Sequence, residues 1–495
     1  MANPMDLAFI LSGGGCGPHQ ETPIRHDEPP DPARYNGGIV LTQLPIEVLH
    51  QIFKWLPIID VLEIPRACSY LRAAFKHHPT FYRDVYLQHL DTPRKLTLDW
   101  EREVRRLARF EVACLQRNSA RELNHLFVYN IITHLLHNAT PNNSPVPEEQ
   151  CHAPSRNLDL LQRLFKLDPT AIAFMQQSTL FTRARDASIW SVHDAPSRDI
   201  DPSATMKQQS AKLHVLYGRP IFSSGRMRSA RTYPYACSKV FDMRRYTHET
   251  RWGPYLVDGS GHVDWEMLEA IMVVVGFNFP SNWRGVSHGM WNTLFQGAWP
   301  NSSRFIRSCL DSSSLEARDP YGVTGRWKRT FAFIDYGAYR EFNFMADLDR
   351  DPIEDEEDRP VLEPKPRMAL DVPGHFRHCD MCLRVRSIDP PGAKDGQDLP
   401  VVSFDGRIEG GNVINSAEPF SDVFFRGTVR LTRENEVRWT TGIIPDGQVR
   451  WRSEGIQVGG VRSARGVVGT WFPSNYEIRD PCGPMLYWKI SGSPD

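Results

Sequence analysis

Apolar residues between Leu41 and Leu90 recur at the spacing of amphipathic helices, not in the alternation that strands show. The first run consists of Leu44, Val48, Leu49, Ile52, Phe53 and Leu56. Pro45 suits the first turn of a helix because its missing N–H would have no partner there, and Pro57 ends the run. The pattern therefore predicts a helix over 44–56.

Two more short helices are predicted before Pro79. Asp60 with Glu63 has the form of a capping box, so we expect the second helix to start there and Pro65 to interrupt it. The third apolar face consists of Ala67, Cys68, Leu71, Ala74 and Phe75. Three such helices in roughly 40 residues are close to the lower limit for an independent core. The stretch is either the first part of a larger helical protein or a helical adaptor that completes its core against a partner.

The order of the residues resembles the F-box family over nearly the whole stretch. The matching phrases are Leu-Pro-Ile-Glu-Val-Leu at 44–49, Ile-Phe at 52–53, Asp-Val-Leu at 60–62 and Leu-Arg at 71–72. The resemblance implies an F-box over 39–90 that binds a Skp-type adaptor and, through it, a cullin–RING scaffold. It assigns the adaptor-binding role to Leu44, Pro45, Val48, Leu49, Ile52, Phe53 and Leu56. The sequence departs from the family at Pro65, inside the second helix, and at Phe81-Tyr82, where the family has a closing Trp.

The overall charge and the cysteine usage limit the class of protein. A formal net charge of −1 predicts no nucleic-acid partner and no membrane partner. No run approaches the roughly 20 apolar residues that span a bilayer, and Met1–Ile10 lacks the cationic start and apolar centre of a signal peptide. Nine cysteines are spread sparsely along the chain, which is typical of a reducing compartment. We therefore expect a cytoplasmic or nuclear protein.

Shifts in composition divide the chain before and after the predicted F-box into a tail, a linker and a connector. Residues 1–38 are polar and rich in Gly and Pro, which predicts a disordered tail. Three runs of apolar residues at helical spacing lie at 100–115, 123–136 and 158–165. They predict a helical linker over 91–182. Residues 183–210 are rich in Ser, Asp, Arg and Pro, so we expect a loop there, within a loop-rich connector over 183–247.

The remaining segment, 248–495, has a β-rich pattern. Val-Arg-Trp at 437–439 recurs at 449–451, and Asp-Gly at 446–447 between them is a tight-turn signal. Strand alternation places Val437 and Trp439 on one face. Glycines punctuate the later runs, which predicts an antiparallel meander that curls into a barrel or a strongly twisted sheet. The residues expected to close this barrel are Trp471, Pro484, Tyr487 and Trp488. The fold class is therefore α+β, with N-terminal helices before a large β-rich domain.

Three further local features are predicted in this segment. Residues 329–335 and 339–345 have the composition of strands. Residues 346–365 are strongly acidic and contain prolines, which indicates a solvated loop. Asp264 is placed as the N-cap of an apolar helix over 265–275.

The half of the chain from Arg251 onward resembles the C-terminal region of a group of fungal F-box proteins. The matching phrases are Trp-Gly-Pro-Tyr to Val-Asp-Trp-Glu at 252–266, Gln-Val-Gly-Gly-Val-Arg-Ser at 457–463 and Gly-Thr-Trp at 469–471. The resemblance implies a β-rich recognition module and names no substrate.

One cluster of metal-ligand types lies in this half. It consists of His375, His378, Cys379 and Cys382, which fall within eight residues. Structural zinc usually takes its ligands as two separated pairs, and a single tight cluster would strain to close a tetrahedron. We therefore expect no metal and reduced thiols, with a zinc site as the alternative. No Gly-x-Ser-x-Gly elbow is present either, so the sequence predicts no cofactor and a non-catalytic chain.

Arginines and tryptophans concentrate in residues 424–465. These side chains are enriched at binding hot spots, and guanidinium groups suit carboxylates and phosphates. The residues predicted to bind a target are Arg438, Trp439, Arg450 and Trp451. The alternative is an ordinary solvated sheet face beside a packed aromatic face.

Two functions follow as the main hypotheses, beside a third in which the chain is an F-box protein that works outside the ligase. In the first, the chain is the substrate-recognition subunit of a Skp–cullin–F-box ubiquitin ligase: the F-box binds the adaptor, the C-terminal half binds an unidentified target protein, and the ubiquitin chemistry occurs on other subunits. In the second, the barrel binds a small ligand or is an enzyme, and the F-box controls the protein's own turnover. A deep apolar pocket with converging polar groups would favour the second hypothesis.

Overall fold

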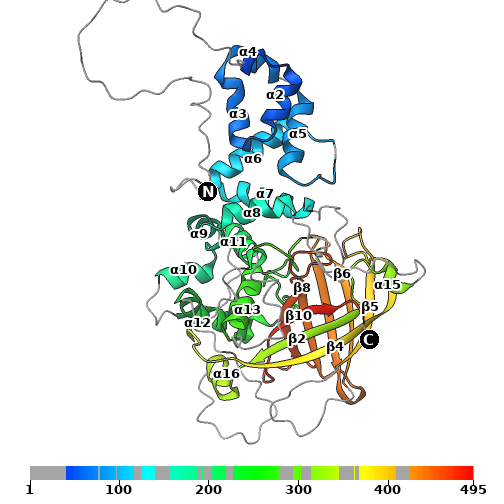
Figure 1. Cartoon of the computed structure of the whole chain (residues 1–495). Helices are drawn as coiled ribbons and strands as arrows, with labels where there is room; N and C mark the ends of the chain where they lie inside the picture. The colour runs from blue at the N-terminus through cyan, green and yellow to red at the C-terminus, as the bar shows by residue number, and fades with distance from the viewer. Residues whose placement is uncertain are drawn as a thin grey trace, which may run out of the picture. The chain divides into compact units, whose positions relative to one another are not determined.

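A computed structural model describes most of the chain, as Figure 1 shows. The described residues are 41–75, 78–95, 97–115, 124–139, 155–186, 192–193, 203–218, 227–278, 294–299, 302, 314–344, 362, 367–408 and 423–493. The chain divides into two compact units, Met1–Gln116 and Arg117–Asp495. This division falls inside the segment 91–182 that the sequence analysis treats as one linker. The predicted tail 1–38 and most of the predicted acidic loop 346–365 lie outside the described residues.

The first unit is helical. After a short 3-10 turn, η2 (Leu41–Gln43), it contains α2 (Ile46–Phe53), α3 (Ile58–Ala67), α4 (Ser69–Phe75), α5 (Pro79–His89) and α6 (Trp100–Leu115). Helix α6, predicted as part of the linker, packs against α5 and α3. Phe81 and Tyr82 are buried and stack edge to face with ring centroids 5.5 Å apart. These two aromatic rings therefore supply apolar volume at the position where the sequence lacks the closing Trp.

The start of α3 differs from the prediction. The helix begins directly after Pro57, whose φ of −48° already has a near-helical value, so Asp60 lies inside the first turn and caps nothing. Pro65 does not interrupt the helix, which continues to Ala67. A proline removes one backbone hydrogen bond from a helix interior. That loss falls in the last turn, where Arg72 Nε donates to the Pro65 carbonyl at 3.1 Å.

The second unit starts with a helical layer. It contains α7 (His125–Asn138), α8 (Arg156–Phe165), α9 (Asp168–Met175), α10 (Thr179–Asp186), α11 (Ala204–Tyr217), α12 (Met227–Phe241) and α13 (Trp265–Asn278). Helices α7, α8 and α13 match predicted helices, and the Asp264 side chain caps α13 by accepting from Met267 N at 3.0 Å. Helix α11 begins inside the loop predicted over 183–210, and both α11 and α12 lie in the segment 183–247 that was predicted as a loop-rich connector. Helix α11 buries seven of the eight residues from Ser210 to Tyr217, all except Lys212, so its second half shows no polar stripe from which a helical period could be recognised.

A closed antiparallel barrel follows, confirming the predicted meander (Figure 1). Its strands are β2 (Gly325–Phe333), β4 (His375–Asp389), β5 (Val401–Ile408), β6 (Phe424–Leu431), β7 (Val437–Ile444), β8 (Trp451–Gln457), β9 (Val467–Pro473) and β10 (Gly483–Ser491). Strand β10 pairs with β9 on one side and with β2 on the other, which closes the ring. Two short strands, β1 (Val192–His193) and β3 (Arg367–Met368), pair separately. Short turns of helix lie at α15 (Leu315–Arg318), η5 (Met243–Arg245) and η7 (Pro445–Gly447).

The predicted strand at 339–345 is wrong. These residues lie mostly in α16 (Tyr336–Asn343), which Asp335 begins by accepting a hydrogen bond from Ala338 N at 3.1 Å. The helix buries Tyr339, Phe342 and Asn343 on one face. An N-cap and a short amphipathic face therefore decide the structure here over the aromatic residues that favour strands.

One end of the barrel interior is filled by aromatic side chains. Trp327, Phe404 and Trp439 meet there, with ring centroids 5.1 Å apart for Trp327 and Trp439 and 5.4 Å apart for Phe404 and Trp439. As predicted, Val437 and Trp439 share the inner face of β7. On the next strand, Gly455 of β8 pairs with Trp439 and also faces Gly469 of β9, and a Cβ on Gly469 would lie 2.0 Å from the Glu454 carbonyl oxygen. Glycine at that position therefore lets the strands approach closely as the sheet curves.

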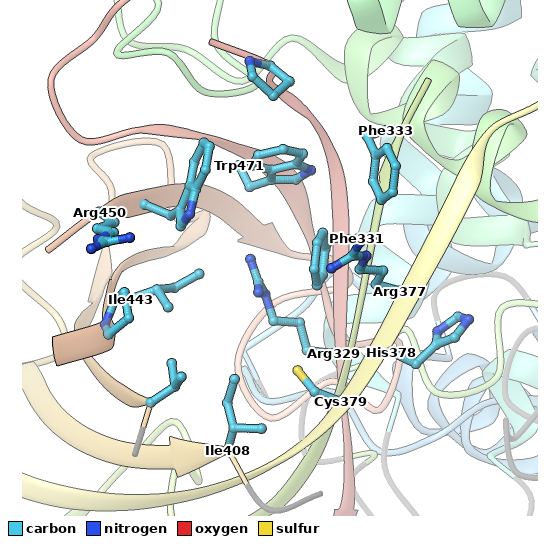
Figure 2. Close-up of a pocket in the computed structure, with 14 residues that line it drawn as sticks. Arg329, Phe331, Phe333, Arg377, His378, Cys379, Ile408, Ile443, Arg450 and Trp471 are labelled. Carbon is cyan, nitrogen blue, oxygen red and sulfur yellow. The ribbon is translucent and has the colours of Figure 1, made fainter. Parts of the chain in front are cut away.

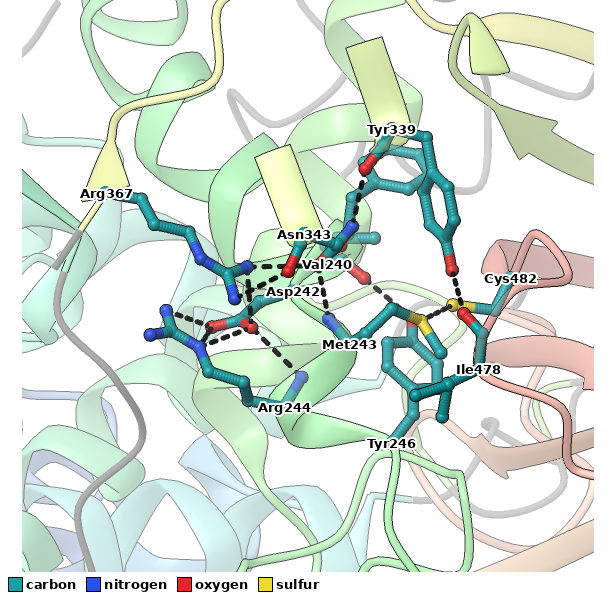
Figure 3. A network of polar contacts seen from close by, with 11 residues as sticks. Val240, Asp242, Met243, Arg244, Tyr246, Tyr339, Asn343, Arg367, Ile478 and Cys482 are labelled. Carbon is teal, nitrogen blue, oxygen red and sulfur yellow. Dashed lines mark hydrogen bonds and ion pairs between the residues drawn. The ribbon is translucent and has the colours of Figure 1, made fainter. Parts of the chain in front are cut away.

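The helical layer is fastened to the barrel by apolar packing and by a buried polar network. Helix α13 packs on β9 and β10, and α12 also packs on β10. Figure 3 shows the network, in which Asn343 accepts from Met243 N at 2.9 Å and donates to the Phe241 carbonyl at 3.0 Å. Asp242 pairs with Arg244 at 2.8 Å and with Arg367 at 3.3 Å. The network joins the end of α12 to α16 and β3, and it reaches the barrel where Cys482, just before β10, donates to Met243 Sδ at 3.0 Å.

Candidate functional site

The first candidate surface is the exposed apolar face of α2. Val48 and Ile52 lie one helical turn apart, and their side chains are 42% and 43% exposed. Trp55, just after the helix, is 65% exposed, and Pro45 before the helix is also exposed. Residues spaced three or four apart share one side of a helix. We call Pro45, Val48, Ile52 and Trp55 the α2 face.

The predicted adaptor-binding residues divide into two groups. Pro45, Val48 and Ile52 lie on the α2 face, and Leu44 and Leu56 are half-buried beside it. Leu49 and Phe53 point the other way and are only 0% and 4% exposed, inside the core of the first unit. Trp55 was missed, although its spacing of three from Ile52 and seven from Val48 was visible in the sequence.

The second candidate site is a cavity of 450 Å³ at one end of the barrel. Figure 2 shows its lining. The walls come from the ends of β2, β5, β7 and β9 and from the starts of β4 and β8. Most of the lining is apolar: Phe331, Phe333, Ile408, Val423, Ile443, Pro445, Trp451, Trp471 and Pro481. The polar lining residues are Arg329, Arg377, His378, Cys379 and Arg450, and no lining residue that the structure describes is acidic.

Arg329 is the deepest cation of this pocket. It lies on the inner face of β2 opposite Cys379 of β4 and Tyr487 of β10 and is only 3% exposed. Its guanidinium carbon lies 4.6 Å from the centroid of the Phe331 ring and 5.7 Å from the centroids of the Phe425 and Tyr487 rings. Burial raises the pKa of the Cys379 thiol, while the adjacent Arg329 guanidinium opposes that shift. Within the described residues, Arg329 Nε has no hydrogen-bond partner.

Arg377 and His378 belong to β4, which forms one wall of the pocket. The Arg377 guanidinium lies 5.4 Å from the centroid of the Phe333 ring. His378 Nδ1 is hydrogen-bonded to Thr330 Oγ1 at 2.8 Å. Burial, reinforced by the charge of Lys328, lowers the pKa of His378 to about 3. His378 is therefore neutral near neutral pH, and the positive charge of the pocket comes from its arginines.

The four predicted target-binding residues are not on one surface. Arg450 and Trp451 line the pocket. Trp439 is 1% exposed in the aromatic core, where its Nε1 donates to Gln457 Oε1 at 3.2 Å. Arg438 lies on the outer face of β7, paired with Glu454. Sequence reasoning missed the other lining residues, among them Arg329 and Phe331. These two alternate on one strand, so an arginine on the apolar face of β2 was the available signal.

The four residues of the zinc alternative lie on one strand, β4. Alternation along a strand places His375 and Cys379 on one face and His378 and Cys382 on the other. The residues that the structure describes contain no group of three or more metal-ligand side chains that could hold an ion.

Comparison with known proteins gives one match. A family model described as F-box-like matches residues 41–88. Neither the curated proteins nor the solved structures yield a match. Within the described part of the chain, no helix is long and apolar enough to cross a membrane. Residues 41–88 therefore form an F-box-like domain, and a C-terminal eight-stranded antiparallel barrel follows it along the chain.

Proposed function

We propose that this chain is the substrate-recognition subunit of a Skp–cullin–F-box ubiquitin ligase. The observation that carries the proposal is the F-box-like match at 41–88 together with the α2 face, where Val48, Ile52 and Trp55 leave apolar surface exposed. Burial of apolar side chains is the main favourable term in association between proteins. The α2 face is therefore the surface that meets a Skp-type adaptor, and the adaptor links it to a cullin–RING scaffold.

The second unit is the target-binding part in this proposal. Its barrel mouth carries Arg450 and Trp451, and Arg377 lines the same pocket on the other side (Figure 2); arginine forks suit carboxylate or phosphate groups of a target segment. The chain itself contributes proximity and no catalytic residue, because ubiquitin transfer takes place on other subunits. The protein acts in the cytoplasm, the nucleus or both.

Affinity purification of the tagged full chain, with the proteasome inhibited, tests this function. The wild-type chain should bring down a Skp-type adaptor, a cullin and accumulated target proteins. A Val48→Asp/Ile52→Asp variant should lose the adaptor and the cullin but keep the targets. The matched control is Val112→Asp, which changes a valine that is 39% exposed and belongs to a different helix of the same unit, α6. Equal recovery of the adaptor by all three chains would contradict the proposal.

The pocket favours a second candidate function, a small-ligand-binding barrel whose F-box mediates regulated turnover. A cavity of 450 Å³ lies within the range of small-molecule sites, roughly 300–1,000 Å³, and it has the apolar lining with a few polar groups that such sites share. Turnover of the chain itself discriminates the two functions. Under the second function, the Val48→Asp/Ile52→Asp variant has a longer half-life than the wild type and no other protein accumulates in its presence. Under the first, target proteins accumulate.

A further inference from the structure

We infer that the barrel pocket binds a small organic anion, a carboxylate on an apolar body, with Arg329 as its counter-ion. This inference names the ligand class for the second candidate function, and the adaptor-binding role of the α2 face does not depend on it. It rests on the position of one buried arginine, on the chemistry of the walls around it and on the closed end of the barrel beneath it.

Among the residues that the structure describes, the guanidinium of Arg329 has no acidic partner. No ion pair joins Arg329 to a carboxylate of the described residues, and its Nε has no hydrogen-bond partner among them. The nearest polar side chain across β10, Tyr487, directs its hydroxyl to Ser453 Oγ at 2.7 Å and presents only its ring to Arg329. Arginine remains charged in proteins, and an unpaired buried charge is strongly unfavourable. Ring faces at 4.6 to 5.7 Å offset only part of that cost.

The cavity gives an anion access to this charge. Figure 2 shows Arg329 projecting into the pocket between Phe331 and Ile443, below Trp471. A guanidinium presents five N–H donors in a planar fork that fits a carboxylate. The lining that the structure describes contains no acidic residue, so no carboxylate there competes with a ligand for these donors, and the polar side chain beside the guanidinium is the Cys379 thiol.

The walls determine the body of the ligand. Phe331, Ile443, Trp451 and Trp471 surround the guanidinium with apolar surface, so a strongly hydrated anion such as phosphate would lose its water without equivalent partners. Trp327 and Trp439 close the far end of the barrel. A ligand therefore enters from the mouth with its charged group first, and its apolar part fills the space between the aromatic walls.

The test uses the purified full chain and two sets of probes. The members of each set differ from one another mainly in charge. The first set is 1-anilinonaphthalene-8-sulfonate and its uncharged analogue N-phenyl-1-naphthylamine, followed by fluorescence. The second is decanoate, decanol and decylamine, used as competitors. We expect saturable binding of the anionic probe at one site, displacement by decanoate at a concentration at least about tenfold lower than by decanol, and no displacement by decylamine or inorganic phosphate.

Variants then locate the anion site. Arg329→Met should weaken the anionic probe at least about tenfold and the neutral probe less than about twofold, since only a charge-assisted contact is lost. Arg329→Lys should recover part of the anion binding. The control, Arg426→Met, changes an exposed arginine of β6 that pairs with Asp405 outside the pocket, and it should bind both probes as the wild type does.

Three results would overturn the inference: no saturable binding of the anionic probe to the wild type, equal potency of decanoate and decanol, or displacement by phosphate but not by decanoate. The comparison among decanoate, decanol and decylamine needs only the wild-type chain, so it decides the question even if Arg329→Met fails to fold. Retained adaptor binding by a chain that fails this test would leave the ligase role standing.

Discussion

Arg438 donates two hydrogen bonds, each 2.8 Å long, to the two carboxylate oxygens of Glu454 on the neighbouring strand. The pair lies under Tyr255, whose ring centroid is 5.6 Å from the Arg438 guanidinium and whose hydroxyl donates to Glu454 at 3.4 Å. Thr440 adds a further hydrogen bond to the same carboxylate at 3.1 Å. This arrangement connects the segment before α13 to the outside of the barrel, so Arg438 has a structural partner instead of an open surface.

Replacing Arg438 by Met should lower the free energy of unfolding of the second unit by about 3 kcal/mol, because the largely buried Glu454 carboxylate is left without its cation. Urea unfolding combined with hydrogen exchange of β7 and β8 measures this. The double variant Arg438→Met/Glu454→Leu should regain part of the loss. The exposed pair Arg426–Asp405 provides the control, since Arg426→Met should change the same quantity by less than about 1 kcal/mol. Similar effects of the two single variants would refute the structural role.

Truncating a side chain on the buried side of α2 should destabilise the first unit much more than truncating one on its exposed side. Leu49→Ala removes a fully buried side chain and should destabilise the first unit by about 2–5 kcal/mol. Val48→Ala, one residue earlier, should change the stability by less than about 0.5 kcal/mol because that side chain is 42% exposed. Thermal unfolding of the full chain, followed by hydrogen exchange of α2 to α5, separates the two. A large loss from Val48→Ala would mean that the α2 face is covered within the chain.

His378 should make the barrel less stable in acid. Its pKa falls from 6.5 to about 3 in the folded protein, so the unfolded chain binds the proton more tightly and stability decreases as the pH drops from about 6.5 toward 3. Between pH 7 and pH 5 the contribution is up to about 2 kcal/mol. His378→Asn should reduce this pH dependence. Burial also lowers the pKa of His125, but that residue is present in both chains and so cancels in the comparison. The unfolding free energies of the wild type and of His378→Asn, measured at pH 7 and pH 5, test this prediction. An equal loss of stability in the two chains would exclude it.

The sequence was sufficient where a local signal sets the structure. The helix α13 follows from Asp264 and the apolar run after it, and the β7–β8 hairpin follows from the repeated Val-Arg-Trp around Asp-Gly. It was insufficient where packing sets the structure. Helix α11 lacks a polar face because it is buried along its second half, and α16 depends on one cap at Asp335.

The candidate sites show the same division. The F-box resemblance assigned the adaptor-binding role to Val48 and Ile52 but did not separate the exposed side of α2 from the core side, so Leu49 and Phe53 were grouped with them. The pocket depends on ring closure, which brings Arg329 of β2 beside Cys379 of β4 and within reach of Trp471 of β9. No spacing along the chain encodes that proximity, because the strands involved are far apart in sequence.

The central claim is that the α2 face binds a Skp-type adaptor, and calorimetric titration of the purified full chain with a purified adaptor tests it most directly. The account predicts saturable one-to-one binding by the wild type, at least about 100-fold weaker binding by Val48→Asp/Ile52→Asp because two apolar contacts are replaced by desolvated charges, and wild-type affinity for Val112→Asp. Full affinity in the Val48→Asp/Ile52→Asp chain, or no binding by a folded wild-type chain, would contradict the account.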